Sequence, residues 1–239
     1  MPDITTHNEL IETGERFMSV EQYRFEPYTE HYFAGCVDLI MSTWNFHSRF
    51  VNVPCNRIIY EYYLKTCLNW NHHLEIIVDE FDQVVGILFG SKEEISYIEE
   101  LKFVRKDRLN NKWKNKKINN GDFGDPDIAK QELMLFTLND ALGEKDACLF
   151  DGEVNLFIVS PSLQGKGLGR KLMNRYMDFC RCNQLGRVFL WTDNDCNHGF
   201  YSKYGFSLYK RFCAYSCYGV KSSTENGMVF SIEVKNAVF

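Results

Sequence analysis

The chain has 239 residues, of which 45% are hydrophobic and 25% charged, and these are ordinary values for a globular protein. Its formal net charge of −5 argues against general nucleic-acid binding and mildly favours a cationic partner. The apolar runs are only strand-length and the first residues lack a basic segment before an apolar one, so we expect a cytoplasmic protein with no membrane association. The nine cysteines lack paired C-x-x-C spacing, so we expect reduced thiols and no metal site.

The first part of the chain predicts a strand followed by two helices. Residues 1–20 have no strong period and are expected to form an N-terminal arm. Residues 22–28 predict a strand, and apolar residues at helical spacing predict a helix over 33–44. Start signals at 54–56 and an apolar face over 59–70 predict a second helix.

A hairpin and a helical segment are predicted next. Two β-rich runs, residues 74–78 and 84–89, flank a polar turn and predict the hairpin. Residues 91–147 then carry two helix patterns, one over Tyr97–Leu109 and one over Asp125–Gly143 with both start and stop signals.

A run of positive charge lies inside this helical segment. Residues 102–117 hold eight lysines and arginines against the single acid Asp107, with Trp113 among them. Such a patch could bind nucleic acid or a phosphate group, but a charge run this short in an acidic chain is more often a solvated face. We therefore expect no nucleic-acid partner.

The stretch Glu153–Leu172 passes from an apolar strand, expected over Glu153–Val159, through a glycine-rich turn into an amphipathic helix. The turn contains Gly165, Gly167 and Gly169. Glycines leave the backbone open to a ligand, and the first N–H groups of a helix have no intrahelical partner. An anion such as a pyrophosphate can satisfy those groups, and Lys166 and Arg170 add positive charge nearby.

The spacing separates three kinds of phosphate loop. A Walker loop needs a lysine followed by serine or threonine, which this turn lacks. A dinucleotide fingerprint needs a third glycine at the position that Arg170 occupies. The pattern that remains is Gln164-x-x-Gly167-x-Gly169.

The sequence downstream of this loop strengthens its interpretation. A strand predicted over 187–192 precedes the segment Asn194–Phe206, which begins with asparagine, carries tyrosines on a short helix and ends in Gly-Phe. Two last strands are predicted over 207–215 and 228–234. The glycine loop and the Asn194–Phe206 segment together resemble the GNAT superfamily of acyl-CoA-dependent N-acetyltransferases.

The resemblance implies an α/β fold in a single domain over residues 1–239. GNAT proteins have a mixed, mostly antiparallel sheet of about seven strands flanked by helices. The family joins strands 3 and 4 by a short turn, so residues 91–147 would be a helical insertion at this place. We expect the insertion to act as a lid or substrate wall.

The resemblance also implies acetyl-CoA as co-substrate. The pyrophosphate would lie on the glycine loop, and main-chain groups of Phe157 and Val159 would bind CoA, with the Val159 N–H facing the thioester oxygen. The residues expected to bind CoA are Phe157, Ile158, Val159, Gln164, Gly165, Lys166, Gly167, Leu168, Gly169, Arg170, Asn194 and Tyr201.

Two proton carriers are expected at the thioester. Glu153 lies four residues before Phe157, hence on the same face of the strand, and matches the place of a carboxylate base in some family members. An ordinary salt-bridged glutamate is the alternative, and Asp151 could compete as the base. Tyr201 matches the family's tyrosine that protonates the leaving thiolate, with Tyr204 as the fallback donor and a core role as the alternative.

The acceptor pocket is expected near the end of the first helix, at Trp44, Phe46 and His47, although a capping or surface role is favoured for His47. We predict an N-acetyltransferase that moves an acetyl group from acetyl-CoA to a primary amine by direct attack. The sequence does not identify the amine, which could belong to a small molecule or a peptide. The alternatives are a catalytically silent acyl-CoA-binding or interaction module and a GNAT-like transferase with another acyl donor.

Overall fold

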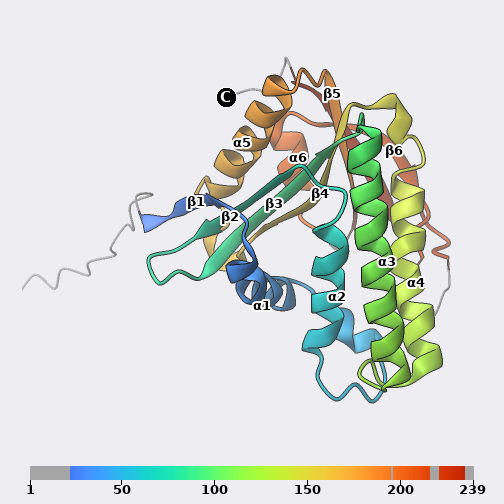
Figure 1. The fold of residues 1–239 in the computed structure, drawn as a ribbon. Coiled ribbons are helices and arrows are strands. Elements are labelled where there is room, and N and C mark those ends of the chain that lie inside the picture. Colours follow the sequence, from blue (N-terminus) through green and yellow to red (C-terminus); the bar gives the residue numbers. More distant parts are fainter. Residues whose placement is uncertain (1–21, 195, 216–220, 235–239) are drawn as a thin grey trace, which may run out of the picture.

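Seven strands form one mixed sheet in the computed structural model of the protein, which describes residues 22–194, 196–215 and 221–234 (Figure 1). The strands are β1 Arg24–Pro27, β2 His73–Val78, β3 Val84–Lys92, β4 Gly152–Val159, β5 Arg187–Asp193, β6 Ser207–Phe212 and β7 Gly227–Glu233. Their order is β1-β2-β3-β4-β5-β7-β6, and every neighbouring pair is antiparallel except β4 and β5. The expected N-terminal arm, residues 1–20, lies outside the described residues.

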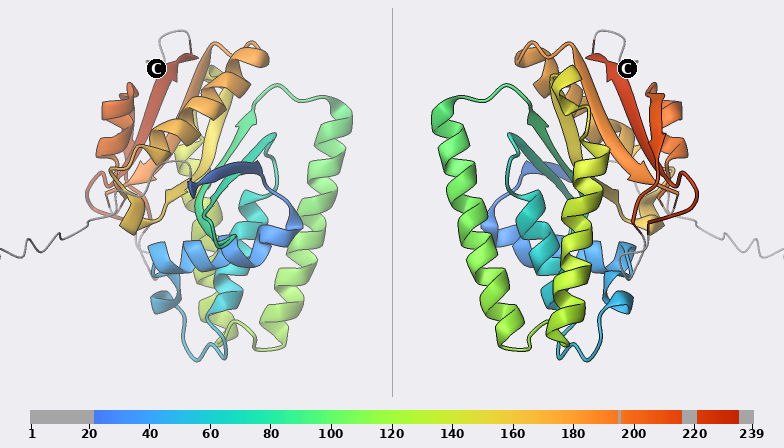
Figure 2. Two further views of the ribbon diagram at one scale, coloured as in Figure 1. Left: turned by 90° about the vertical axis from the view of Figure 1, so that its left-hand side faces the viewer. Right: turned by 90° about the vertical axis from the view of Figure 1, so that its right-hand side faces the viewer.

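Helices cover both faces of this sheet (Figure 2). The helices are α1 Phe33–Thr43, α2 Arg57–Cys67, α3 Tyr97–Asn119, α4 Pro126–Gly143, α5 Leu168–Cys182 and α6 Gly199–Tyr204, with short 3₁₀ turns at Glu30–Tyr32, Phe46–Arg49, Ala147–Leu149 and Pro161–Leu163. On one face, Ile87 and Phe89 of β3 pack with α1 and α2. On the other face, Leu88 packs with α5. Because side chains alternate along a strand, one strand contributes to two cores.

The helical insertion predicted between β3 and β4 is a pair of long helices with well-defined caps. The Ser96 hydroxyl accepts a hydrogen bond from the Glu99 N–H, and the Glu99 carboxylate accepts one from the Ser96 N–H, which makes a capping box at the start of α3. The Asp125 carboxylate caps α4 by accepting from the N–H groups of Asp127 and Ile128 at 3.0 Å. Local sequence signals therefore fix where both helices start.

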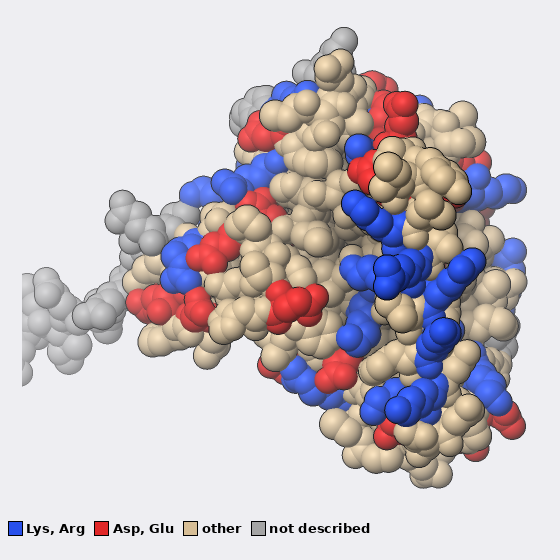
Figure 3. All heavy atoms as spheres, viewed as in Figure 1, with Lys and Arg blue, Asp and Glu red and all other residues tan. Residues whose placement is uncertain are grey.

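The basic run of residues 102–117 lies within α3, which extends to Asn119 and is longer than its apolar pattern predicts. Figure 3 shows lysines and arginines gathered as a band along this helix. Lys106 donates to the Leu68 carbonyl (2.6 Å), so the band also holds α3 against the end of α2. Neither this helix nor any other described helix is long and apolar enough to cross a membrane.

The second helix is shorter than predicted. α2 ends at Cys67, and Trp70, which we expected on its apolar face, has a φ of +56°. The Trp70 indole N–H donates to the Asp107 carboxylate of α3 (2.8 Å), and the Asn69 side-chain amide donates to the same carboxylate. The chain therefore leaves the helix early because it docks on the insertion before it enters β2.

β4 pairs with its parallel neighbour β5 over only its first two residues, and the strands then diverge. On its other side β4 stays paired with β3, and beyond its end the Ser160 N–H donates to the Val85 carbonyl at 2.9 Å. N–H groups alternate between the two sides of a strand in an antiparallel ladder. The N–H and C=O groups of Phe157 and Val159 therefore point into the gap that β5 leaves.

Candidate active site

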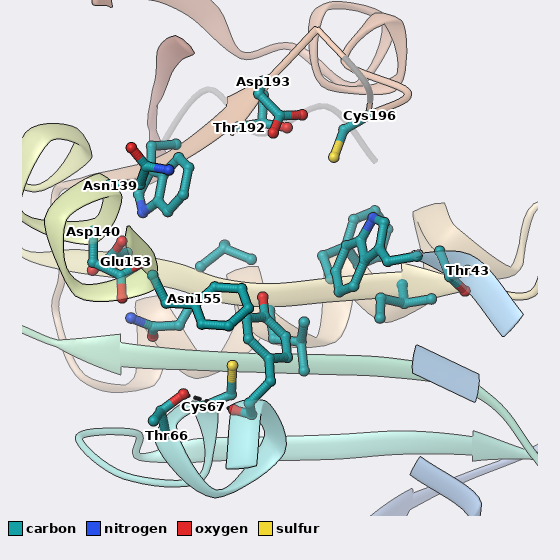
Figure 4. A pocket seen from close by; sticks show the side chains of 18 of the residues that line it. Thr43, Thr66, Cys67, Asn139, Asp140, Glu153, Asn155, Thr192, Asp193 and Cys196 are labelled. Carbon is teal, nitrogen blue, oxygen red and sulfur yellow. Dashed lines mark hydrogen bonds between the residues drawn. The ribbon is translucent and has the colours of Figure 1, made fainter. Parts of the chain in front are cut away.

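A cavity of about 1820 Å³ opens at the gap between β4 and β5 and extends to the insertion. Its lining comes from β4 and the glycine loop, from α6 and the end of β5, and from α2 and α4. Figure 4 shows how polar side chains from these elements, among them Asp140, Glu153 and Asp193, lie around it. Segments far apart in the sequence thus face one space.

The glycine loop before α5 is open on the side where a ligand would approach. Gly165 and Gly167 have φ values of +82° and +81°, and a Cβ at either position would meet no atom within 4 Å. Gly169 serves the packing instead, because a Cβ there would lie 3.2 Å from the Phe157 ring. No backbone acceptor among the described residues satisfies the N–H groups of Gly165, Gly167, Leu168 and Gly169. These groups and the helix start fit a pyrophosphate.

β4 carries a β-bulge at Asn155, where its pairing with β3 shifts by one residue. Val154 before the bulge and Phe157 after it both pack on the α5 face, although an unbroken strand would put them on opposite faces. Glu153 therefore points to the α4 face, while the Tyr176 hydroxyl of α5 holds its carbonyl from the other side (2.9 Å). Our expectation that Glu153 and Phe157 share a face is wrong, because it assumed a strand without an extra residue.

Glu153 is the centre of a group of carboxylates at the α4 end of the cavity. Its side chain is 4% exposed, and its pKa is raised well above the usual range by burial and by the nearby Glu144, Glu93 and Asp140. Burial also raises the pKa values of Asp140 and Glu144 to about 7, although both residues are exposed to the cavity. No group of three or more such side chains in the described part of the chain is arranged to hold a metal ion.

Asp140 and Glu144 were not predicted as site residues from the sequence. The signal was their spacing, because residues four apart lie on one face of a helix. It was not decisive, because carboxylates on an insertion helix are usually solvated and the sequence did not bring α4 next to β4. We define these two residues together with Glu93 and Glu153 as the acidic cluster.

Asp140→Asn is expected to stabilise the fold more at about pH 8 than at about pH 4. Folding raises the Asp140 pKa from 3.8 to about 7, so the folded state holds a proton that the unfolded state has released. Below the unfolded pKa, Asp140 is protonated in both states and does not lower the free energy of unfolding of the wild type. This free energy falls as the pH rises towards 7, whereas asparagine never ionises. Thermal unfolding at both pH values measures the difference. Equal shifts of the melting temperature at the two pH values, or the same pattern in the exposed control Asp127→Asn, would show that the effect does not come from the raised pKa of Asp140.

Tyr201 of α6 lines the cavity next to Phe157, with their ring centroids 6.3 Å apart. Its ring also contacts those of Phe200, Phe206 and Phe230. Burial raises its pKa, which keeps the hydroxyl protonated, and no hydrogen bond from the described residues engages that hydroxyl. Tyr204 differs, because its hydroxyl donates to the Asn174 side chain (2.7 Å). Tyr201 is therefore the better placed of the two predicted proton donors.

A group of four packed aromatic rings lines another part of the cavity. They belong to Trp44, Phe46, Tyr63 and Phe136. Trp44 and Phe46 are thus where the sequence analysis placed the acceptor pocket. His47 does not line the cavity, and its Nδ1 lies 2.7 Å from the Tyr60 hydroxyl, as the favoured structural role implies.

Three residues expected to bind CoA do not line the cavity with their side chains. The Leu168 side chain is buried in the core, Lys166 is exposed, and Asn194 is exposed where the chain leaves β5. Asn197 lines the cavity instead and donates to the Gln164 side chain (3.4 Å), which links α6 to the glycine loop. The sequence could not choose between two asparagines three residues apart.

Comparison with known proteins finds one family model over part of the chain and a set of similar solved structures. The model of the acetyltransferase (GNAT) family matches residues 134–206. No curated protein matches the chain in sequence. The structure is similar to arylalkylamine N-acetyltransferase 2 from Aedes aegypti, with 13% identity over 89% of this chain and 99% of that one and a TM-score of 0.52. It is also similar to a putative acetyltransferase of the GNAT family from Desulfovibrio desulfuricans, with 13% identity, 89% and 99% coverage and a TM-score of 0.50. At such identities the likeness concerns the fold, and it confirms the predicted one.

Proposed function

We propose that the chain, of which residues 134–206 match the acetyltransferase (GNAT) family model, moves an acetyl group from acetyl-CoA to a primary amine by direct attack. The observation that supports this most is a single cavity faced by the glycine loop, by the free N–H groups of Phe157 and Val159 and by Tyr201. Acetyl-CoA supplies an activated thioester. The loop fits its pyrophosphate, and the gap between β4 and β5 fits its pantetheine arm.

The length of β4 limits where the thioester can lie. Because of the bulge, Glu153 and Phe157 lie opposite β3 residues only three apart, about 10 Å along the strand, and Glu153 and Val159 opposite residues five apart, about 17 Å. A base acts within hydrogen-bond reach, directly or through water. A glutamate side chain with one or two waters spans the first distance and not the second. We therefore assign the thioester oxygen to the Phe157 N–H and a pantetheine amide to Val159, in place of the arrangement taken from the resemblance.

Each group then acts on one part of the transfer. The amine enters from the α4 face, and Glu153 accepts its proton through water. The Phe157 N–H donates to the carbonyl oxygen as negative charge develops there. Tyr201 gives its proton to the departing thiolate sulfur.

Glu153→Gln is expected to lower the rate about 10²–10⁴-fold near neutral pH, and the rate of the variant should recover as the pH rises. The raised pKa makes Glu153 a stronger base, and rising pH ionises it in the wild type. In the variant, rising pH supplies neutral amine without a base. Steady-state rates across the pH range measure both effects, and a loss that persists at high pH would remove Glu153 as the base.

The matched control for this variant is Asp151→Asn. Asp151 was the competing candidate, but its carboxylate accepts from the N–H groups of Gly186 and Arg187, each at 2.8 Å, and it does not line the cavity. We expect its substitution to leave the shape of the pH–rate profile unchanged. If Asp151→Asn alters the pH–rate profile and Glu153→Gln does not, Asp151 is the general base.

A mass-spectrometric search for acetylated products in a panel of amines tests the proposal as a whole. Acetyl transfer to at least one primary amine is expected. CoA binding without transfer to any amine would favour the silent binding module, and transfer of a longer acyl group alone would favour the other acyl donor. Absence of CoA binding would overturn the proposed N-acetyltransferase and both of these alternatives.

A further inference from the structure

The acidic cluster lacks an ion-pair partner within the part of the chain that the structure describes. Asp140 and Glu144 lie one turn apart on α4, and Glu93 and Glu153 face the same end of the cavity. No lysine, arginine or histidine of the described residues forms an ion pair with any of the four, and the nearby Lys92 pairs with Glu99 instead (3.6 Å). Like charges gathered in a cavity raise one another's pKa values and are stable as anions only beside a cation.

Glu153 is a separate indication of a missing partner. It comes from β4 rather than α4, it is 4% exposed, and it faces the cavity (Figure 4). Buried carboxylates in folded proteins are normally paired with a cation or hydrogen-bonded. Within the described residues no ion pair reaches this carboxylate, and the Asn155 side chain that hydrogen-bonds to it carries no charge, so a cationic ligand is the partner that would complete it.

Aromatic surface lies next to the acidic cluster. Gly143 ends α4 against Trp191, where a Cβ would approach the indole Cγ to 2.3 Å, so the indole and the carboxylates of α4 belong to one wall of the cavity. The rings of Trp44, Phe46, Tyr63 and Phe136 line the same space. Flat apolar faces beside carboxylates suit methylene groups that carry ammonium groups.

We propose that the acceptor is a linear diamine or polyamine whose second ammonium group is bound by Asp140 and Glu144. This rests on the proposed function, because the first amine must lie between Glu153 and the Phe157 N–H for transfer. The acidic cluster extends from Glu153 away from the glycine loop, so a chain that reacts at one end presents its other end to α4. An ammonium group has three donors, and carboxylates four residues apart on a helix can share them.

The wild-type protein is tested with two probes of equal length, 1,5-diaminopentane and hexylamine, which differ by one terminal ammonium in place of a methyl group. We expect kcat/KM to be about 10²-fold higher for the diamine, because two charge-assisted hydrogen bonds are gained. Calorimetric titration of each amine into the CoA-bound protein should give the same preference. Equal kcat/KM and equal affinity for the two amines would overturn the inference, while acetylation of either would leave the proposed function standing.

The double variant Asp140→Asn/Glu144→Gln tests the assigned residues. It should bring the diamine preference to within a few-fold of unity and leave CoA affinity unchanged, and it should fold because it removes charges that folding disfavours. Asp127→Asn, which removes a charge from the exposed start of the same helix, should keep the full preference. A preference that survives the double variant would overturn the assignment. Diamine binding that the double variant abolishes, without acetylation of any amine, would uphold the binding site and overturn the proposed function alone.

Discussion

Replacing Gly167 by valine is expected to abolish CoA binding. Gly167 precedes α5 with a φ of +81°, a conformation that a β-branched residue disfavours, and a side chain there would enter the open space above the loop. Losing two charge-assisted hydrogen bonds to the pyrophosphate, each worth about 1.5–3 kcal/mol, would weaken binding about 10²–10⁴-fold. Calorimetric titration with CoA measures the loss directly.

The chain offers a matched control in Gly121, between α3 and α4. It has a φ of +78°, and its Cβ would also meet nothing within 4 Å. Gly121→Val therefore imposes the same backbone strain far from the loop and should bind CoA as the wild type does. Equal CoA affinity in wild type and a folded Gly167→Val variant would remove the glycine loop from the CoA site.

Tyr201→Phe is expected to lower kcat about 10²–10⁴-fold across the whole pH range while CoA affinity is kept. The departing thiolate needs a proton at every pH, and the raised pKa of Tyr201 keeps its proton available into the alkaline range. Only a hydroxyl is removed, and the ring contacts with Phe157 and Phe230 remain. Steady-state kinetics from acid to alkaline pH, with CoA affinity measured in parallel, separate this behaviour from that of Glu153→Gln.

Tyr204→Phe is the control for Tyr201→Phe. Its hydroxyl is engaged by Asn174, so its loss should affect stability more than turnover. A near-wild-type Tyr201→Phe together with an impaired Tyr204→Phe would transfer the proton donor's role to Tyr204. If neither variant is impaired, the proton comes from solvent.

The elements of the fold could be predicted because each is encoded locally. The helix of the glycine loop, the hairpin and the final strands follow from periodicity, and the caps at Ser96 and Asp125 mark where the insertion helices begin. The prediction that Trp70 lies on the second helix is wrong because its position is set by Asp107, which lies 37 residues further along the chain. The limit of α2 is therefore a tertiary effect.

The same distinction applies to the site. The glycine loop and Tyr201 lie in continuous motifs, and both line the cavity as expected. The face of Glu153 could not be predicted, because the bulge at Asn155 is a property of pairing with β3 and leaves no residue signature that we could identify. Asp140 and Glu144 became visible only once α4 was placed beside β4.

The bond between the Tyr176 hydroxyl and the Glu153 carbonyl makes α5 a spacer. The first turn of this helix forms the glycine loop's anion site, and Tyr176 lies about 12 Å further along the helix axis, where it anchors the backbone at Glu153. One rigid rod thus sets the distance between the cofactor end and the carboxylate end, and α3 and α4 take no part in it. Evolution could remodel the insertion to admit new acceptors without changing the distance between the anion site and Glu153, on which the chemistry depends.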